Sequence, residues 1–387
     1  MGEKTKIQWC DHTFNCWRGC AKVSPGCANC YADAQAKRNP GVLGIWGPSG
    51  TRVVASESKW REPLKWNRDA EKAGVRRRVF CASMADVFED WTGDIRLASG
   101  DIAGREIAGG GMMKLTLDDV RARLFSLICD TPNLTWLLLT KRPQNVQPML
   151  ERIGHHGDLP LNIRVGGESS VWDWMPISNV WIGTSVENQA AADGRIPHLL
   201  KIPAAVRFLS CEPLLGPVDL SRWLRGADPD CPSPDSVCPE CGGDVACDGQ
   251  ESLYRCVEHS GIRIGCGWQG DEPDAYECPI DWVIVGGESG QGSRPCQVEW
   301  VRDLVRQCKA ASVPVFVKQL GAVATGNYYD DREFYEHSGY DWPDATNWSH
   351  RDGQPPIGSR VVLPLADAKG GNPDEWPEDL RIREFPA

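Results

Sequence analysis

Three closely spaced cysteines near the start of the chain, Cys20, Cys27 and Cys30, are the residues whose type and spacing bear most directly on chemistry. They have the spacing Cys-x6-Cys-x2-Cys in a loop rich in glycine and proline, which follows a β-branched and aromatic run and precedes a helical pattern from Tyr31. Three thiolates on one loop can ligate three irons of a 4Fe–4S cluster and leave the fourth iron without a protein ligand. Because a small chelating cosubstrate needs such an open iron, the spacing predicts an iron–sulfur site with a free coordination position.

Two alternatives fit the same thiols. Cys16 or His12 could complete a zinc knuckle, and a disulfide could staple the loop. Structural zinc usually has two well-separated knuckles and closed fourfold ligation, whereas this loop holds one crowded group of thiols. The spacing favours iron–sulfur ligation but does not by itself name the metal.

The end of the loop, residues 27–32, resembles the cluster loop of radical S-adenosylmethionine enzymes related to spore photoproduct lyase, although their first spacing is Cys-x3-Cys and here it is Cys-x6-Cys. The loop and the phrases at 185–188, 208–217 and 285–290 also resemble an uncharacterised phage and prophage family known for a three-cysteine motif. This likeness covers most of residues 6–321. The first resemblance implies a 4Fe–4S cluster on Cys20, Cys27 and Cys30, S-adenosyl-L-methionine as cosubstrate, and a reductant protein such as flavodoxin or ferredoxin.

The composition is that of a folded globular chain. With 387 residues, of which 41% are hydrophobic and 25% charged, it can form one large α/β domain with an insertion. No apolar run approaches the ~18 residues of a membrane-spanning helix and the first residues have no apolar signal core, so we expect a soluble, cytoplasmic protein. The net charge of −11 argues against a general polyanion-binding surface but leaves a local basic face open.

Apolar runs of strand length alternate with helical patterns along most of the chain. Such near-continuous apolar strands are typical of a parallel sheet that is buried on both faces, so the pattern predicts an α/β fold with a full or partial (β/α) barrel. The resemblance implies that this barrel is of the radical S-adenosylmethionine type. We expect strands at 79–83, 134–140, 180–185, 206–211, 282–286 and 315–318 besides the run before the loop, helices at 31–38, 115–128, 188–201 and 298–311, and a packed loop with short helices at 40–75.

The predicted domains are the first part of the barrel at 1–224, an insertion at 225–280, the last part of the barrel at 281–322, and a C-terminal extension at 323–387. The insertion has the spacing Cys238-x2-Cys241-x14-Cys256, with Cys266 or His259 as the fourth ligand. This spacing indicates a zinc ribbon, whose metal we expect to be structural because small inserted domains need a staple. The extension is rich in Tyr, Asp and Trp, and its composition does not indicate a chemical role.

Functional groups of such a barrel lie at the carboxyl ends of its strands. Hydroxyl, carboxylate and amide side chains there suit the ribose of a cosubstrate, glycines permit close approach of the backbone, and a carboxylate can hold an ammonium group. The residues that we expect to contact the cosubstrate are Tyr31, Ser83, Ser185, Glu187, Asn188, Gly286, Gly287 and Glu288.

Cys211 and Lys318 are the candidate catalytic residues. Beside Glu212 at a strand end, Cys211 could donate a hydrogen atom, a role that resembles that of the donor cysteine in the lyase relatives. A lone cysteine on a buried strand is otherwise an inert small apolar residue. We expect an enzyme that generates a 5′-deoxyadenosyl radical and modifies or repairs a nucleotide or a nucleic-acid base. The alternative is a zinc-binding scaffold or interaction module of phage origin without catalysis.

Overall fold

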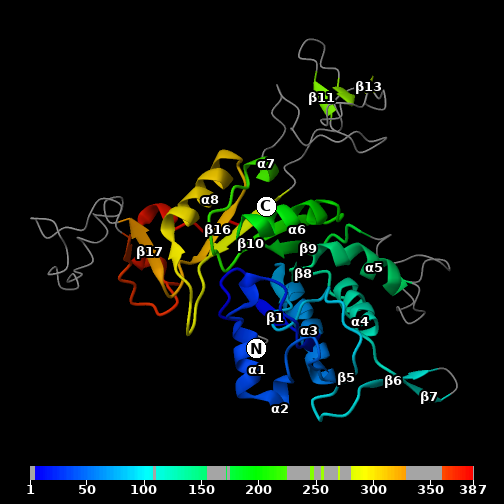
Figure 1. Ribbon diagram of the computed structural model, residues 1–387. Helices are drawn as coiled ribbons and strands as arrows, with labels where there is room; N and C mark the ends of the chain where they lie inside the picture. The colour runs from blue at the N-terminus through cyan, green and yellow to red at the C-terminus, as the bar shows by residue number, and fades with distance from the viewer. Residues whose placement is uncertain are drawn as a thin grey trace, which may run out of the picture.

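The computed structural model describes residues 5–107, 110–154, 171, 175–224, 280–327 and 360–386, together with 245–247, 254–256 and 269–270. Its centre is a seven-stranded sheet in the order β1-β4-β8-β9-β10-β14-β16, in which every neighbouring pair is parallel. The strands are β1 (His12–Phe14), β4 (Arg77–Cys81), β8 (Leu134–Thr140), β9 (Val180–Ser185), β10 (Val206–Cys211), β14 (Trp282–Gly286) and β16 (Val315–Gln319). The sheet is a half-barrel whose strands follow the order of the chain, from blue at β1 to yellow and orange at β16 (Figure 1). The prediction of an α/β fold with a partial parallel barrel is confirmed.

The longer helices lie between consecutive strands of the sheet in the chain. They are α1 (Tyr31–Arg38), α3 (Glu57–Ala73), α4 (Leu117–Cys129), α5 (Val146–Gly154), α6 (Gln189–Leu200) and α8 (Val298–Ala310), with the short α2 (Pro40–Leu43) and α7 (Ser221–Leu224). Helix α4 begins at a capping box, in which Thr116 Oγ1 accepts from the Asp119 N–H at 3.2 Å and the Thr116 N–H donates to Asp119 Oδ2 at 2.7 Å.

Helix α3 differs from the prediction for residues 40–75. The sequence predicts a packed loop with short helices, but α3 is the longest helix of the described part of the chain. It buries Trp60, Pro63 and Trp66 on one face, where Trp60 packs edge-on to Phe14 at 5.1 Å. A proline in the interior and widely spaced tryptophans hide the helical period, since proline normally ends a helix.

The two faces of the sheet bury different side chains, because neighbouring residues of a strand point to opposite faces. The helix-covered face packs Leu138, Leu209 and Val283 against α4, α6 and α8 in the larger core. The other face, called here the aromatic face, gathers Trp9, Phe80, Leu137, Phe208, Trp282, Ile284 and Phe316. The last residues of the chain cover part of this aromatic face, where the Phe385 ring lies 5.5 Å from Trp282 and the Trp282 indole donates to the Glu384 carbonyl at 2.9 Å.

Among the residues that the structure describes, four small sheets accompany the half-barrel. Strands β11 (Val245–Cys247), β12 (Tyr254–Cys256) and β13 (Gln269–Gly270) form an antiparallel sheet within the predicted insertion. The predicted zinc ligands Cys238, Cys241, His259 and Cys266 lie outside the described residues, and only the backbone of Cys256 is described, so the zinc ribbon stays a prediction. The other small sheets are β2 (Trp17–Arg18) with β3 (Arg52–Val54) and β5 (Ile95–Arg96), β6 (Gly104–Ile107) with β7 (Gly111–Lys114), and β15 (Cys296–Gln297) with β17 (Ala324–Asn327) and β18 (Arg360–Val362).

Within the described ranges, none of the helices combines the length and the apolar character needed to cross a bilayer.

Candidate functional site

The thiol loop, defined here as residues 19–30, lies across the carboxyl ends of the sheet's strands. After β4, the Met84 carbonyl accepts from the Gly19 N–H at 3.1 Å. After β9, Glu187 Oε1 accepts from the Gly26 N–H at 3.4 Å, and after β14, Glu288 Oε2 accepts from Asn29 Nδ2 at 2.9 Å. Three strand ends therefore hold the loop, and its thiols lie at the edge where a parallel barrel carries its functional groups.

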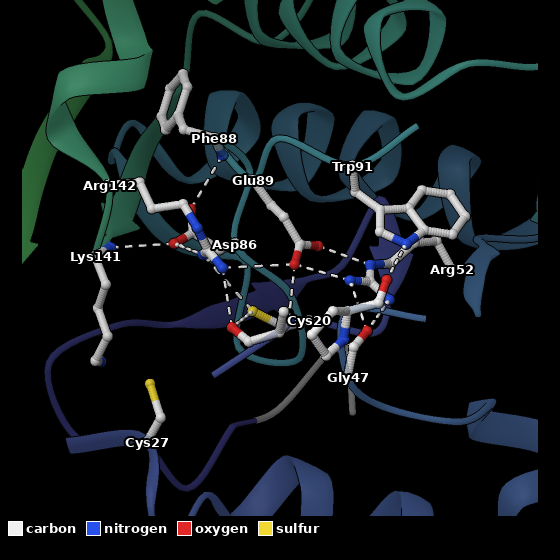
Figure 2. Close-up of polar contacts among 12 residues, drawn as sticks. Cys20, Cys27, Gly47, Arg52, Asp86, Phe88, Glu89, Trp91, Lys141 and Arg142 are labelled. Atoms are coloured by element: carbon white, nitrogen blue, oxygen red, sulfur yellow. Dashed lines mark hydrogen bonds and ion pairs between the residues drawn. The ribbon is translucent and has the colours of Figure 1, made fainter. Parts of the chain in front are cut away.

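Cys20 lies beside a buried cation (Figure 2). Arg142 Nη1 donates to Cys20 Sγ at 3.8 Å and pairs with Asp86 Oδ2 at 2.8 Å, while Arg142 Nη2 donates to the Ala21 carbonyl at 2.9 Å. Burial, together with the charges of Asp86 and Glu89, raises the pKa of the Cys20 thiol to about 12. A bound metal would favour the thiolate, as it does for coordinating thiols in general.

The backbone next to Cys20 is fixed by a second buried ion pair. Arg52 Nε and Nη2 donate to Glu89 Oε2 and Oε1 at 2.7 and 2.8 Å, and the two side chains are 0% and 2% exposed. The backbone of the thiol loop also binds Glu89, since the Ala21 N–H donates to Glu89 Oε1 at 2.7 Å. Figure 2 shows this pair and the Arg142–Asp86 pair side by side above Cys20. The two pairs together determine the position of Cys20.

Cys27 has the opposite electrostatic environment. It ends the 3-10 turn Pro25–Cys27, and its thiol lies 3.8 Å from Ser24 Oγ. Burial opposes ionisation, but hydrogen bonds from the backbone of Val23 and Ser24 and the charge of Lys141 outweigh it and hold the pKa of Cys27 below its ordinary value. The Lys141 side chain reaches toward the Cys27 sulfur in Figure 2. The loop therefore presents one thiol with a lowered pKa, and cations lie beside two of its three cysteines.

In the described part of the chain, the loop thiols are not grouped as ligands of a metal ion. Among the residues that the structure describes, no group of three or more His, Cys, Asp or Glu side chains is arranged so that it could hold a metal ion. Cys16, a candidate to complete a zinc knuckle, is fully buried in the helix-covered core and interacts with Cys81, and His12 stacks on Trp66 at 4.3 Å. The three loop thiols are half-buried, and Cys20 and Cys27 each have a cation beside them, so their donor type and surroundings are compatible with the negative charge of a thiolate-bound iron–sulfur cluster.

The polar residues predicted to contact a cosubstrate lie at this same edge, but most have protein partners. Arg195 Nη1 pairs with Glu187 Oε2 at 2.7 Å, Asn188 caps α6 by accepting from the Ala191 N–H, and Lys141 Nζ donates to Ser185 Oγ at 2.9 Å. Burial of Glu187 opposes its ionisation, but hydrogen bonds and charge from Arg195 keep its pKa below the ordinary value.

The other three polar candidates hold the thiol loop in place. Glu288 accepts from Arg294 Nη2 at 2.6 Å as well as from Asn29. Tyr31 and Ser83 meet each other, because the Tyr31 hydroxyl donates to the Ser83 carbonyl at 2.6 Å.

Gly286 and Gly287 are required by contacts within the protein. A Cβ on Gly286 would lie 2.8 Å from Glu212 Oε1, and one on Gly287 would lie 2.2 Å from the Leu320 carbonyl. Both distances are shorter than van der Waals contact, so a larger residue would displace the Glu212 side chain at Gly286 and the segment after β16 at Gly287. The sequence predicts that these glycines let the backbone approach a cosubstrate closely. In the structure they allow close packing against Glu212 and Leu320 of the same chain.

The two candidate catalytic residues lie in different environments. Cys211 is fully buried in the helix-covered core, where burial first and then the neighbouring Cys308 and Glu212 raise its pKa well above the ordinary value. This place favours the alternative of an inert apolar residue. Lys318 is partly exposed and pairs with Glu212 Oε1 at 2.8 Å. It follows Phe316 by two residues and therefore shares the aromatic face.

Sequence reasoning missed the cations that organise the site. Arg52, Arg195 and Arg294 pair with Glu89, Glu187 and Glu288. No spacing in the sequence predicts these pairs, because the fold brings their two members together.

The model of a family described as protein of unknown function (DUF5131) matches residues 4–96 and 113–351. The chain belongs to this family. No curated protein and no solved structure matches the chain.

Proposed function

We propose that the protein is a radical S-adenosylmethionine enzyme in which Cys20, Cys27 and Cys30 hold a 4Fe–4S cluster. The observation that carries the proposal is the placement of the thiol loop, which hydrogen bonds tie to the carboxyl ends of β4, β9 and β14 in a parallel half-barrel. A cluster there would face the sheet's polar rim, with three protein ligands and one open iron.

When bound, the cluster supplies the electron that cleaves S-adenosylmethionine into methionine and a 5′-deoxyadenosyl radical. The residues of the chain bind and orient the cluster and the cosubstrate. Arg142 and Lys141 lie beside Cys20 and Cys27 and offset the negative charge of a thiolate-bound cluster.

The remaining polar groups give the site its shape. Glu288 is saturated by Arg294 and Asn29, so we assign it to positioning the loop. The aromatic face supplies an apolar floor that excludes water from one side of the sheet, a condition that protects reactive intermediates from side reactions. For the substrate we propose a nucleotide or a nucleic-acid base, and for the electron donor a small reductant protein such as flavodoxin or ferredoxin.

Anaerobic reconstitution with iron and sulfide tests the proposal. We expect a brown protein that absorbs broadly near ~400 nm, contains about four irons and four sulfides per chain, and forms 5′-deoxyadenosine with dithionite and S-adenosylmethionine. Replacing Cys20, Cys27 or Cys30 with serine should abolish the absorbance. The matched control is Cys129→Ser, which removes an equally half-buried thiol at the last residue of α4 and should leave the absorbance intact. A colourless protein that takes up only zinc in the thiol loop would refute the proposal.

A further inference from the structure

An open groove with a volume of about 670 Å³ lies between the thiol loop and helix α6. One wall is the loop at residues 23–25, the second is the segment that follows β8, and the third is a face of α6. On the α6 wall, Ala191 and Gly194 are small, and a Cβ built on Gly194 would have no neighbour within 4 Å. The helix therefore leaves the groove wide enough for a ligand to approach beside the thiol loop.

The groove is locally positive in an acidic chain. Among the described residues that line it, Lys141, Arg142 and Arg195 are cationic, and Glu187 is the single carboxylate and is paired with Arg195 at 2.7 Å. His198 adds an exposed imidazole at the far end of the α6 wall. The chain as a whole has a net charge of −11, so an anion that is repelled elsewhere is attracted here.

Lys141 is the cation available for a ligand. Its ammonium donates to Ser185 Oγ at 2.9 Å and, among the described residues, pairs with no carboxylate. Arg142 is paired with Asp86 and donates to the Ala21 carbonyl, so its charge is offset and its donors are occupied. A half-buried ammonium that lacks a carboxylate partner is a binding group for phosphate oxygens.

We propose that this groove binds the phosphate groups of a nucleotide or of a nucleic-acid strand and so brings the attached sugar and base to the thiol loop. Lys141 contacts the phosphate nearest the loop, and His198 lies where a following phosphate would pass. Delivery to the loop rests on the proposed function, whereas phosphate binding rests on the groove alone.

Fluorescence anisotropy of the full chain with labelled oligo(dT) and oligo(rU), with AMP as competitor, tests the binding. We expect Lys141→Gln, which removes the positive charge, to weaken binding about tenfold and to lower the slope of log K against log salt by about one. His198→Gln should weaken strand binding more than AMP binding. The matched control is Arg306→Gln on α8, which removes one positive charge from a side chain that is 75% exposed and pairs with Asp303, and should leave affinity unchanged.

The competition experiments distinguish a free nucleotide from a polynucleotide as the ligand. Competition by AMP at the affinity of the strands indicates a nucleotide, and tight binding of the strands alone indicates a polynucleotide. The proposal is overturned if AMP and both strands fail to bind, or if Lys141→Gln and Arg306→Gln weaken binding equally. Each titration is run with and without the reconstituted cluster. If the protein forms no cluster but still binds the phosphate ligands, the proposed function is refuted and the phosphate-binding proposal is supported.

Discussion

Replacing Glu89 with glutamine tests the buried ion pair that fixes Cys20. The glutamine keeps the shape of the side chain but removes the charge that neutralises Arg52, whose side chain is 0% exposed. It also weakens the acceptor for the Ala21 N–H, which now lies 2.7 Å from Glu89 Oε1. Removing one member of a buried pair costs about 3–5 kcal/mol, because the remaining charge is left without a partner.

A second pair provides the matched control. Arg123 and Glu57 have the same two-bond geometry, with distances of 2.7 and 2.6 Å, but their side chains are 45% and 65% exposed. Exposed pairs contribute about 0.2–1 kcal/mol, so Glu57→Gln should cost far less than Glu89→Gln.

Urea unfolding followed by tryptophan fluorescence gives the two free energies of unfolding. In the folded Glu89→Gln protein, alkylation of Cys20 by iodoacetamide should also be faster than in the wild type, since the loop has lost its anchor. If Glu89→Gln costs no more than Glu57→Gln and leaves the alkylation of Cys20 unchanged, the pair does not fix the loop.

Three further predictions concern the thiols, the pH dependence and the folded frame. In metal-free protein near neutral pH, iodoacetamide should modify Cys27 before Cys20, because the pKa of Cys27 lies below its ordinary value and that of Cys20 is about 12; peptide mass spectrometry that finds equal rates would contradict this. Although burial opposes ionisation of Glu187, Arg195 lowers its pKa, so the stabilisation from its charge is present above the ordinary value of 4.5 and is lost as the pH falls through the folded-state pKa. The stability difference between wild type and Glu187→Gln should therefore shrink in acid, and a difference that stays constant with pH would disprove the assignment. Thr116→Ala should cost about 1 kcal/mol of unfolding free energy through loss of the α4 cap, and no measurable loss in urea unfolding would exclude the capping role.

The central sheet is predictable because both of its faces are buried. Strands such as β8 and β14 are therefore near-continuous apolar runs, and their bounds at 134–140 and 282–286 match the prediction. Helix α3 is not predictable in the same way, since Pro63 stands inside it and its two buried tryptophans are six residues apart. Local sequence describes a segment well only where propensity and packing agree.

The position of the candidate site is predictable from the sequence, but the ion pairs and hydrogen bonds within it are not. The strand ends indicate the rim, and the three thiols indicate the loop that lies across it. Arg52 reaches Glu89 across 37 residues and Arg142 reaches Asp86 across 56, which no spacing rule describes. The sequence also cannot tell that Gly286 makes room for Glu212, because that contact joins the ends of two neighbouring strands.

Electron paramagnetic resonance of the anaerobically reconstituted, dithionite-reduced protein, with and without S-adenosylmethionine, tests the open iron most directly. A cluster held by Cys20, Cys27 and Cys30 should give the signal of a reduced 4Fe–4S centre, and the cosubstrate should change that signal by binding the iron that lacks a protein ligand. A signal that S-adenosylmethionine leaves unchanged, or a protein without any iron–sulfur signal, would contradict the proposal.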